Sequence, residues 1–358
     1  MSNYIEYKDK IAFHPGYYIE EIVEESGLTL EELSKRLKTT PKNLNILIRG
    51  EKNLSIDMAY KLSEMLGTTV EYWLTLQKIY DKMQAEFLAD INLEKEVFKD
   101  LDYKYFKHYF GLPNLPRKID EQIKCVRDFL SVQSLTVLKE KDLAVSFRSY
   151  SRKLSTSNIV NANAMVQIAI NLALKTDSPQ FDKKKFEESV EFALTQTRNH
   201  QEFLPIIKEA FLEAGVILIV LPNLKNSGTN GATKMIDGRV LLMVNDRRHF
   251  ADTFWFTLFH EIGHIMNDDY GITFCGNQNS SEDKADLYTQ RKLIPQEQYE
   301  AFIKCHTIFN ELCIREFADS INQDPGIVLG RLQNDGKVSY AETELSNKLR
   351  HKYKVLVK

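Results

Sequence analysis

Cysteine is scarce in this chain of 358 residues. The four cysteines form no CxxC pair, so we expect neither a disulfide framework nor a cysteine-rich zinc finger; they are Cys125, Cys275, Cys305 and Cys313. Apolar runs of roughly 18 residues, the length of a membrane helix, are absent as well. The N-terminus also lacks the apolar stretch of a signal peptide. We therefore expect a cytoplasmic protein with reduced thiols and no membrane contact.

A large excess of one charge is also missing. The 47 Lys and Arg residues nearly balance the 50 Asp and Glu residues, which gives a formal net charge of -3. Any contact with nucleic acid must therefore come from a local basic patch. Hydrophobic residues make up 43% of the chain, enough for a buried core. The length predicts two or three domains, and changes of pattern divide the chain into residues 1–80, 81–202 and 203–358.

The first segment contains five short amphipathic helical patterns joined by loops of a few residues. Gly27, Gly50 and Gly67 each follow the last apolar position of one pattern, where a helix commonly ends. Thr40 followed by Pro41 is a typical helix start. The predicted helices cover residues 14–26, 29–37, 41–49, 55–66 and 68–80. The short turn between the second and third helices is typical of a helix-turn-helix.

Basic side chains gather around that turn. Residues 34–52 contain six Lys and Arg residues and one acidic residue, Glu51, whereas positions 20–32 hold a cluster of acidic residues, Glu20, Glu21, Glu24, Glu25, Glu31 and Glu32. Such a patch suits DNA phosphates. Lys42 and Asn43, near the start of the third helix, are placed to reach base edges. The full set of expected DNA contacts is Lys38, Thr40, Lys42, Asn43, Arg49 and Lys52. An ordinary solvated helix face is the alternative.

Four short motifs give this segment a family resemblance. They are His14-Pro15-Gly16, Leu28-Thr29-x-x-Glu32-Leu33, Ile48-Arg49-Gly50-Glu51-Lys52 and Thr68-x-x-x-Tyr72-Trp73-Leu74-x-Leu76-Gln77. With them, residues 14–80 resemble the HigA/VapI-type antitoxin branch of the XRE helix-turn-helix family. The resemblance implies a five-helix domain that binds double-stranded operator DNA as a homodimer, and a toxin as partner. Lys42 and Asn45 stand where the family commonly has glutamine and a small polar residue, so we expect a different DNA sequence to be read.

The rest of the chain changes from helical to mixed patterns. Residues 81–202 predict further helices and contain no pattern of reactive side chains. After residue 203, β-branched and apolar runs predict strands at residues 216–221, 232–237 and 239–245. Asp237-Gly238 is a hairpin-turn signal. We therefore expect a mainly α protein with an α+β C-terminal domain that contains a small sheet.

A strongly apolar helical pattern follows these strands and contains the sequence His260-Glu261-Ile262-Gly263-His264. Residues four apart on a helix differ by about 40° around its axis, so both imidazoles can hold one metal ion. Glu261 can act as the general base toward water. The alternative is a pair of helix histidines that only pack.

A zinc site needs a third protein ligand. Five carboxylates follow the motif, and the spacing alone does not choose among them; they are Asp268, Asp269, Glu282, Asp283 and Asp286.

Four stretches between residues 203 and 295 resemble the ImmA/IrrE family of zinc peptidases. They are AGVILIVLP, NGA, FWFTLFHEIGH and SEDKADLYTQRKLIP. The family pattern E-x-x-A-[ND] corresponds to residues 282–286, which implies that Glu282 is the third ligand. The resemblance also implies a zincin-like domain and zinc, or another divalent metal, as cofactor. Leu287-Tyr288-Thr289 departs from the family pattern at positions that affect packing rather than ligands.

These observations predict a DNA-binding transcriptional regulator of antitoxin type with a zinc metallopeptidase domain. The metal ligands would be His260, His264 and Glu282, with Glu261 as the catalytic base, and the substrate would be a partner or repressor protein. Two alternatives remain open. One is a non-catalytic autorepressor whose C-terminal domain only binds a toxin or ligand. The other is a repressor that cleaves itself or its partner as a switch.

Overall fold

The computed structural model describes residues 3–140, 154–247, 249–274 and 280–352. The chain divides into two compact units, Met1–Glu94 and Lys95–Lys358. The predicted segments 81–202 and 203–358 thus contribute to one unit, except that residues 81–94 extend the first. The predicted fold class is confirmed, because the described residues are mainly helical with small sheets and an α+β C-terminal region.

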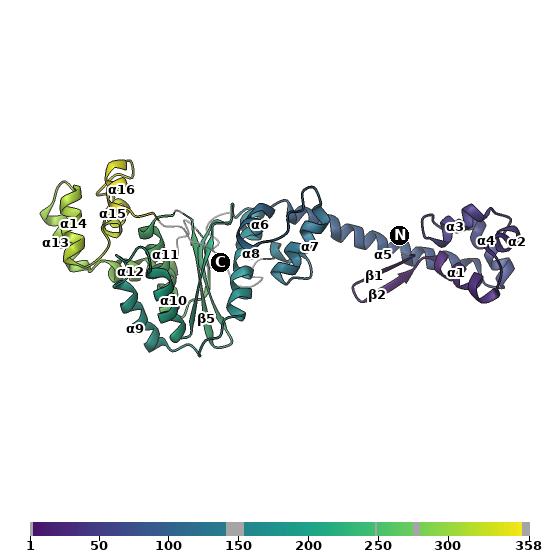
Figure 1. Cartoon of the computed structure of the whole chain (residues 1–358), viewed down its shortest axis with the longest axis horizontal. Helices are drawn as coiled ribbons and strands as arrows, with labels where there is room; N and C mark the ends of the chain where they lie inside the picture. Colours follow the sequence, from purple (N-terminus) through teal and green to yellow (C-terminus); the bar gives the residue numbers. More distant parts are fainter. Residues whose placement is uncertain (1–2, 141–153, 248, 275–279, 353–358) are drawn as a thin grey trace. The chain divides into compact units, whose positions relative to one another are not determined.

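The N-terminal unit consists of a two-stranded hairpin followed by five helices (Figure 1). Its elements are β1 (Tyr4–Tyr7), β2 (Lys10–Phe13), α1 (Pro15–Ser26), α2 (Leu30–Arg36), α3 (Pro41–Ile48), α4 (Ile56–Leu66) and α5 (Val70–Phe98). The core contains Leu33, Leu44 and Trp73, none more than 1% exposed. Gly16 lies so close to α3 that a Cβ atom there would be 2.1 Å from the carbonyl oxygen of Leu47. The glycine therefore lets α1 pack directly against α3.

Two features of this unit differ from the sequence-based expectation. The hairpin was not predicted, because two strands of four residues give too little alternation to recognise. The last helix was expected to end near residue 80 but continues to Phe98. No glycine or proline interrupts residues 70–98, so nothing in that stretch ends the helix. Tyr7 and Lys8 of the hairpin both bind Asp90 on the added part of α5.

The second unit is built on a four-stranded sheet in the order β3-β5-β4-β6. The strands are β3 (Val216–Pro222), β4 (Thr229–Ile236), β5 (Arg239–Asp246) and β6 (Gly271–Phe274). β3 runs parallel to β5, whereas β4 is antiparallel to both β5 and β6. The predicted hairpin turn is confirmed: Asp237 and Gly238 have φ values of 48° and 76°, as a type I′ turn requires. β6 was not predicted.

Both faces of this sheet are buried, which explains the continuous apolar runs of β3 and β5. Val240, Leu242 and Val244 of β5 pack on one face, and Leu241 and Met243 on the other. One face is covered by α6 (Tyr103–Phe110), α7 (Ile119–Leu130), the short 3-10 helix η1 (Leu135–Lys139) and α8 (Thr156–Leu174). The opposite face packs against α9 (Lys183–Leu194), α10 (Phe203–Glu213) and α11 (Ala251–Met266).

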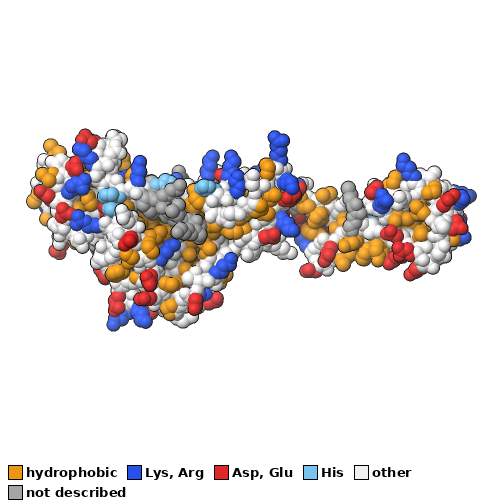
Figure 2. All heavy atoms as spheres, viewed as in Figure 1, with side chains coloured by type: hydrophobic (Ala, Val, Ile, Leu, Met, Phe, Trp, Pro, Cys, Tyr) orange, Lys and Arg blue, Asp and Glu red, His pale blue; other side chains and the backbone are white. Residues whose placement is uncertain are grey.

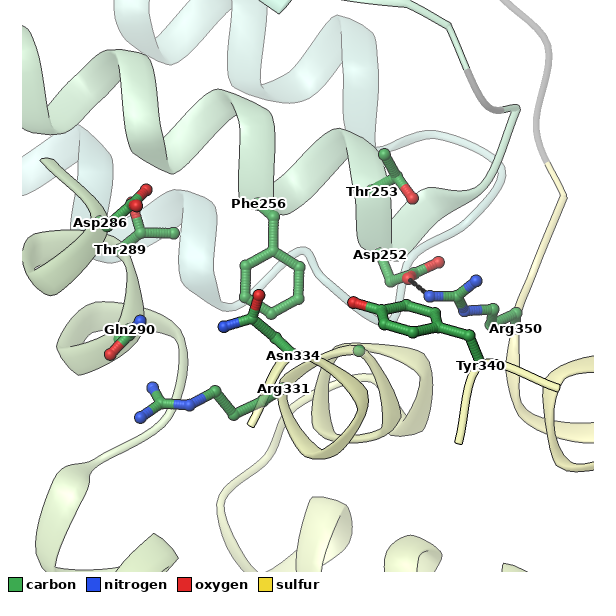
Figure 3. A pocket seen from close by; sticks show the side chains of 11 residues that line it. Asp252, Thr253, Phe256, Asp286, Thr289, Gln290, Arg331, Asn334, Tyr340 and Arg350 are labelled. Carbon is green, nitrogen blue, oxygen red and sulfur yellow. Dashed lines mark ion pairs between the residues drawn. The ribbon is translucent and has the colours of Figure 1, made fainter. Parts of the chain in front are cut away.

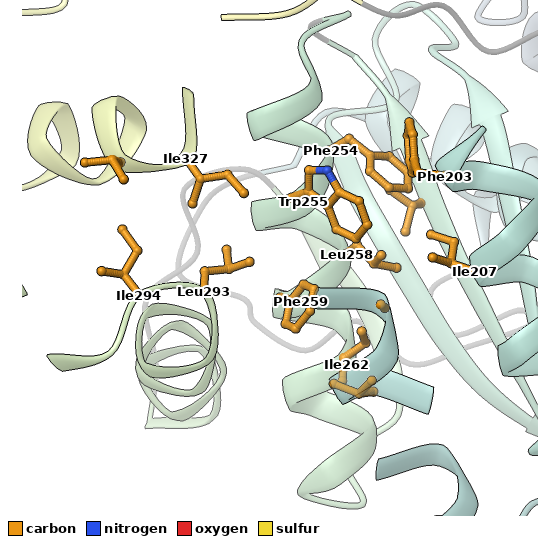
Figure 4. Close-up of a cluster of buried hydrophobic side chains, with 14 of the residues drawn as sticks. Phe203, Ile207, Phe254, Trp255, Leu258, Phe259, Ile262, Leu293, Ile294 and Ile327 are labelled. Atoms are coloured by element: carbon orange, nitrogen blue, oxygen red, sulfur yellow. The ribbon is translucent and has the colours of Figure 1, made fainter. Parts of the chain in front are cut away.

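Helix α11 lies at the centre of the larger core (Figure 4). Trp255, Phe259 and Ile262 are fully buried there. Helices α12 (Ser280–Leu293) and α15 (Pro325–Asn334) pack against it, and the chain also forms α13 (Gln296–Cys305), α14 (Glu311–Ser320) and α16 (Thr343–Leu349). Among the described residues, no helix is both long enough and apolar enough to span a membrane.

Candidate functional site

The HExxH residues lie on the last two turns of α11. The apolar side chains of the helix fix its rotation against the sheet, so His260, Glu261 and His264 take defined positions. His264 and Glu261 are fully buried, and the side chain of His260 is 15% exposed. Helix α12 packs beside α11 and contributes the buried Glu282.

These side chains bring three potential metal donors together. The Nε2 atoms of His260 and His264 lie 3.1 Å apart. Oε2 of Glu282 lies 3.1 Å from Nε2 of His260, and its Oε1 lies 3.7 Å from Nε2 of His264. A tetrahedral zinc ion with bonds of about 2.0–2.2 Å separates its ligand atoms by roughly 3.3 Å. The donor set therefore fits zinc in chemistry and in spacing.

The other ring nitrogens of both histidines face carboxylates. Nδ1 of His260 lies 2.8 Å from Oδ1 of Asp286, and Nδ1 of His264 lies 2.9 Å from Oδ2 of Asp269. Ser281 donates a short hydrogen bond to the same Asp269 oxygen. Carboxylates in such positions fix the orientation of a histidine ligand and make its other nitrogen a better donor.

The five candidate carboxylates thus separate by position. Glu282 faces the Nε2 atoms of the two histidines, whereas Asp286 and Asp269 contact their Nδ1 atoms. Asp268 pairs instead with Lys183 at 3.1 Å, and Asp283 is exposed. Sequence spacing could not distinguish the candidate ligand from the supporting carboxylates, because their positions depend on how α12 packs against α11.

The carboxylates around His260 also change its protonation. Burial by itself would lower the pKa of His260, but hydrogen bonds to Asp286 and Glu282 and the charge of Glu261 outweigh it and raise this pKa to about 10. Without a metal ion the imidazole therefore holds a proton at neutral pH. A cation at the Nε2 atoms would take the place of that proton.

Glu261 faces β4 at the position of Gly231. A Cβ atom at residue 231 would lie only 2.6 Å from the carboxyl carbon of Glu261. The Asn230-Gly231-Ala232 stretch was noticed in the sequence only as part of the family resemblance. The structure explains the glycine of this stretch, because the absence of a side chain at Gly231 makes room for the carboxyl group of Glu261.

A cavity of about 240 Å³ adjoins this centre, between α11, α12 and α15 (Figure 3). Asp286 lines the cavity and also contacts His260, so the two features share a residue. Asp252 lies at the other side, 2.9 Å from Arg350. Burial raises the pKa of Asp252 to about 6, although Arg350 opposes the shift. Sequence reasoning did not identify this cavity, whose lining comes from four separate segments.

The predicted DNA-binding residues lie in and beside the helix-turn-helix. Lys38 occupies the turn between α2 and α3 with a φ of 48°. Lys42 and Asn43 are exposed in the first turn of α3. Arg49 and Lys52 are exposed at the far end of that helix and in the loop after it. Within the described part of the chain, none of the four basic side chains forms an ion pair, so all four can meet phosphates. Figure 2 shows Lys and Arg side chains over α2 and α3.

Thr40 has a structural role that the sequence also suggested. It is the N-cap of α3, and its hydroxyl oxygen accepts a hydrogen bond of 3.2 Å from the backbone N–H of Asn43. The hydroxyl hydrogen is left to donate to another group. The cap fixes the start of the helix that carries Lys42 and Asn43.

Comparison with known proteins matches this part of the chain to a family. Residues 19–73 match the model of the helix-turn-helix family. They run from α1 into α5 and include all six predicted DNA-binding residues, whereas His260, His264 and Glu282 lie outside them.

Curated proteins give a similar result. The chain is 32% identical over 85 residues to a protein of Escherichia coli (strain K12) named "Uncharacterized HTH-type transcriptional regulator YddM". That match covers 90% of the relative and 23% of this chain. It is 33% identical over 76 residues to "Virulence-associated protein I" of Dichelobacter nodosus, covering 70% of the relative and 21% of this chain.

Proposed function

The chain belongs to the helix-turn-helix family of DNA-binding transcriptional regulators, and from this premise we propose that it is an antitoxin-type regulator that also carries a zinc peptidase centre. The N-terminal unit would bind operator DNA as a homodimer. The second unit would hydrolyse peptide bonds in a partner or repressor protein. The cytoplasm, which contains the operator, is the proposed compartment.

The observation that supports the peptidase is the clustering of His260, His264 and Glu282, with their donor atoms within 4.8 Å of one another. These three residues would hold the metal, and zinc suits two imidazoles and a carboxylate. A zinc ion would supply a Lewis acid that polarises the scissile carbonyl.

The chain's own residues supply the remaining chemistry. Asp286 and Asp269 hold the two imidazoles in orientation. Glu261 takes a proton from the attacking water and delivers it to the leaving amine nitrogen, which completes hydrolysis. Its burial keeps it close to the reacting atoms and limits its freedom to turn away.

Glu261 also favours catalysis over a domain that only binds a toxin or ligand. A structural metal site needs its ligands but has no use for a buried carboxyl group beside them. Here the backbone of β4 lacks a side chain at Gly231, where a Cβ atom would lie 2.6 Å from Glu261. That local adaptation is expected where the glutamate reacts.

Zinc content tests the metal assignment. Purified full-length protein would be compared with His260→Ala/His264→Ala, Glu282→Gln and the exposed control Asp283→Asn by inductively coupled plasma mass spectrometry. The first two variants should hold about one zinc ion per chain fewer than wild type, because a three-ligand site that loses a donor binds weakly. The control should match wild type. Equal zinc in wild type and His260→Ala/His264→Ala would reject the assignment.

A further inference from the structure

A second group of metal-type ligands lies in the larger unit, away from the HExxH centre. His200 comes from the segment between α9 and α10, Asp324 is the N-cap of α15, and His351 follows α16. Nε2 of His200 lies 3.0 Å from Oδ2 of Asp324, and Nδ1 of His351 lies 3.2 Å from the same oxygen. We propose that these three residues form a second binding site for a divalent transition-metal ion.

The state of Asp324 supports this proposal. Its side chain is only 1% exposed. Oδ1 accepts a hydrogen bond of 2.7 Å from the backbone N–H of Gly326. Oδ2 is buried, and its two described neighbours are imidazole nitrogens, Nε2 of His200 at 3.0 Å and Nδ1 of His351 at 3.2 Å. A buried carboxylate charge is costly unless it is paired, and a cation held by the carboxylate and both imidazoles would pair it.

The donor spacing agrees with a metal site. All three ligand atoms lie within 4.8 Å of one another, the same limit that the HExxH ligands meet. Two imidazoles and one carboxylate suit zinc, nickel, copper or cobalt, with water at an open position. The side chain of His351 is 46% exposed, so solvent reaches the site from that side.

One rearrangement follows from the geometry of the rings. The imidazoles of His200 and His351 stack with centroids 3.7 Å apart and an angle of 23° between their planes. A metal ion must lie near the plane of each ring that binds it, so stacked rings cannot both bind. His351 is the exposed member, and its ring turns out of the stack when the ion binds. His ring torsions are soft enough to permit this.

The site joins three segments that are distant in sequence and lies at the N-terminal end of α11. The backbone N–H of Ala251 donates to the carbonyl oxygen of His351 at 2.8 Å. Arg350 pairs with Asp252, as Figure 3 shows. The HExxH histidines lie at the opposite end, and Ala251 is about 14 Å along the helix axis from His260. The second ion would therefore join the C-terminal segment to the start of α15 and to the segment between α9 and α10, independently of the HExxH centre.

Metal titration of the full-length chain tests the site. Chelator-treated protein would be dialysed against zinc chloride and its zinc content measured by mass spectrometry. Wild type should hold about two zinc ions per chain, whereas His200→Ala/His351→Ala and His260→Ala/His264→Ala should each hold about one. The variant that combines all four substitutions should hold none. His108→Ala, which removes an exposed histidine elsewhere, should match wild type.

The melting temperature distinguishes a variant that has lost the metal site from a variant that has only misfolded. In the His260→Ala/His264→Ala background, zinc should raise the melting temperature, and the added single change His351→Ala should remove that rise. His351 is half-exposed, so its replacement leaves the core intact. The proposal fails if the His260→Ala/His264→Ala variant binds no zinc, or if His200→Ala/His351→Ala binds as much as wild type. Both outcomes are compatible with zinc at the HExxH site, which is tested separately by the loss of one zinc ion between wild type and His260→Ala/His264→Ala.

Discussion

At the residue scale, the position of Glu261 depends on a neighbour that has no side chain. Gly231 of β4 faces the carboxyl group, and a methyl group there would approach it to 2.6 Å. Glu261 is fully buried, so it has little room to move aside. We therefore expect a substitution at Gly231 to change the free energy of unfolding in a way that depends on Glu261.

Gly231→Ala should lower the free energy of unfolding by about 1–3 kcal/mol, because it forces an extra methyl group into a packed site. In a Glu261→Ala background the same change should cost much less, since the group it collides with is gone. Chemical denaturation of the four proteins gives this coupling as a double-mutant cycle. Additive effects would show that Gly231 is not adapted to Glu261.

Asp286 provides a second test at this scale, because it contacts Nδ1 of His260 rather than the metal position. Asp286→Asn should weaken zinc binding at the HExxH centre about 10–100-fold, as the loss of a supporting carboxylate commonly does. Competition with a chelator would measure the change in the His200→Ala/His351→Ala background. The neighbouring exposed Asp283→Asn is the matched control, and an equal affinity in both variants would remove the supporting role of Asp286.

At the scale of elements, the sequence predicted those helices and strands that carry their own signals. Helix α11 was predicted from its apolar residues, and the β4–β5 hairpin from Asp237-Gly238. The strands β1, β2 and β6 have only four residues each, which is too few for a clear alternation of apolar and polar residues. The supporting roles of Asp269 and Asp286 could not be predicted, because they arise from packing between α11 and α12.

The same limit applies to the His200, Asp324 and His351 cluster. Its members are 27 residues or more apart in the chain, and none belongs to a recognisable motif. Only the folded structure brings them together. By contrast, the predicted DNA-binding residues of α3 are neighbours in sequence, so their grouping could be predicted.

Helix α3 gives a prediction about DNA recognition. Lys42→Ala and Asn43→Ala should each reduce discrimination between operator and random DNA by about 1–3 kcal/mol, since these positions can reach base edges. Lys38→Ala and Lys52→Ala should weaken binding to both DNAs and lower the salt slope by about 1 each, as phosphate contacts do. Fluorescence anisotropy across a salt series measures both effects.

Lys78→Ala is the control for that series, because it removes an exposed positive charge from α5 without touching the helix-turn-helix. It should leave the discrimination unchanged. If all four α3-region variants bind operator DNA as wild type does, α3 does not read DNA, and the N-terminal unit would be a protein-docking module.

At the scale of the whole molecule, the two proposed activities belong to different units. The helix-turn-helix residues belong to Met1–Glu94, and the proposed metal ligands His260, His264 and Glu282 belong to Lys95–Lys358. The chain's formal charge of -3 leaves DNA attraction to the local patch around α3. The central claim is that this DNA-binding regulator also hydrolyses peptide bonds.

Mass spectrometry of new protein N-termini tests that claim most directly. Cells of the native host that express wild type or Glu261→Gln from the same promoter would be compared, after equal zinc content of the two proteins is verified. Glu261→Gln keeps the ligands but removes the base, so cleavage should fall at least about 100-fold. The account predicts N-termini that appear with wild type and are missing with Glu261→Gln. Identical sets of N-termini in both strains would contradict it.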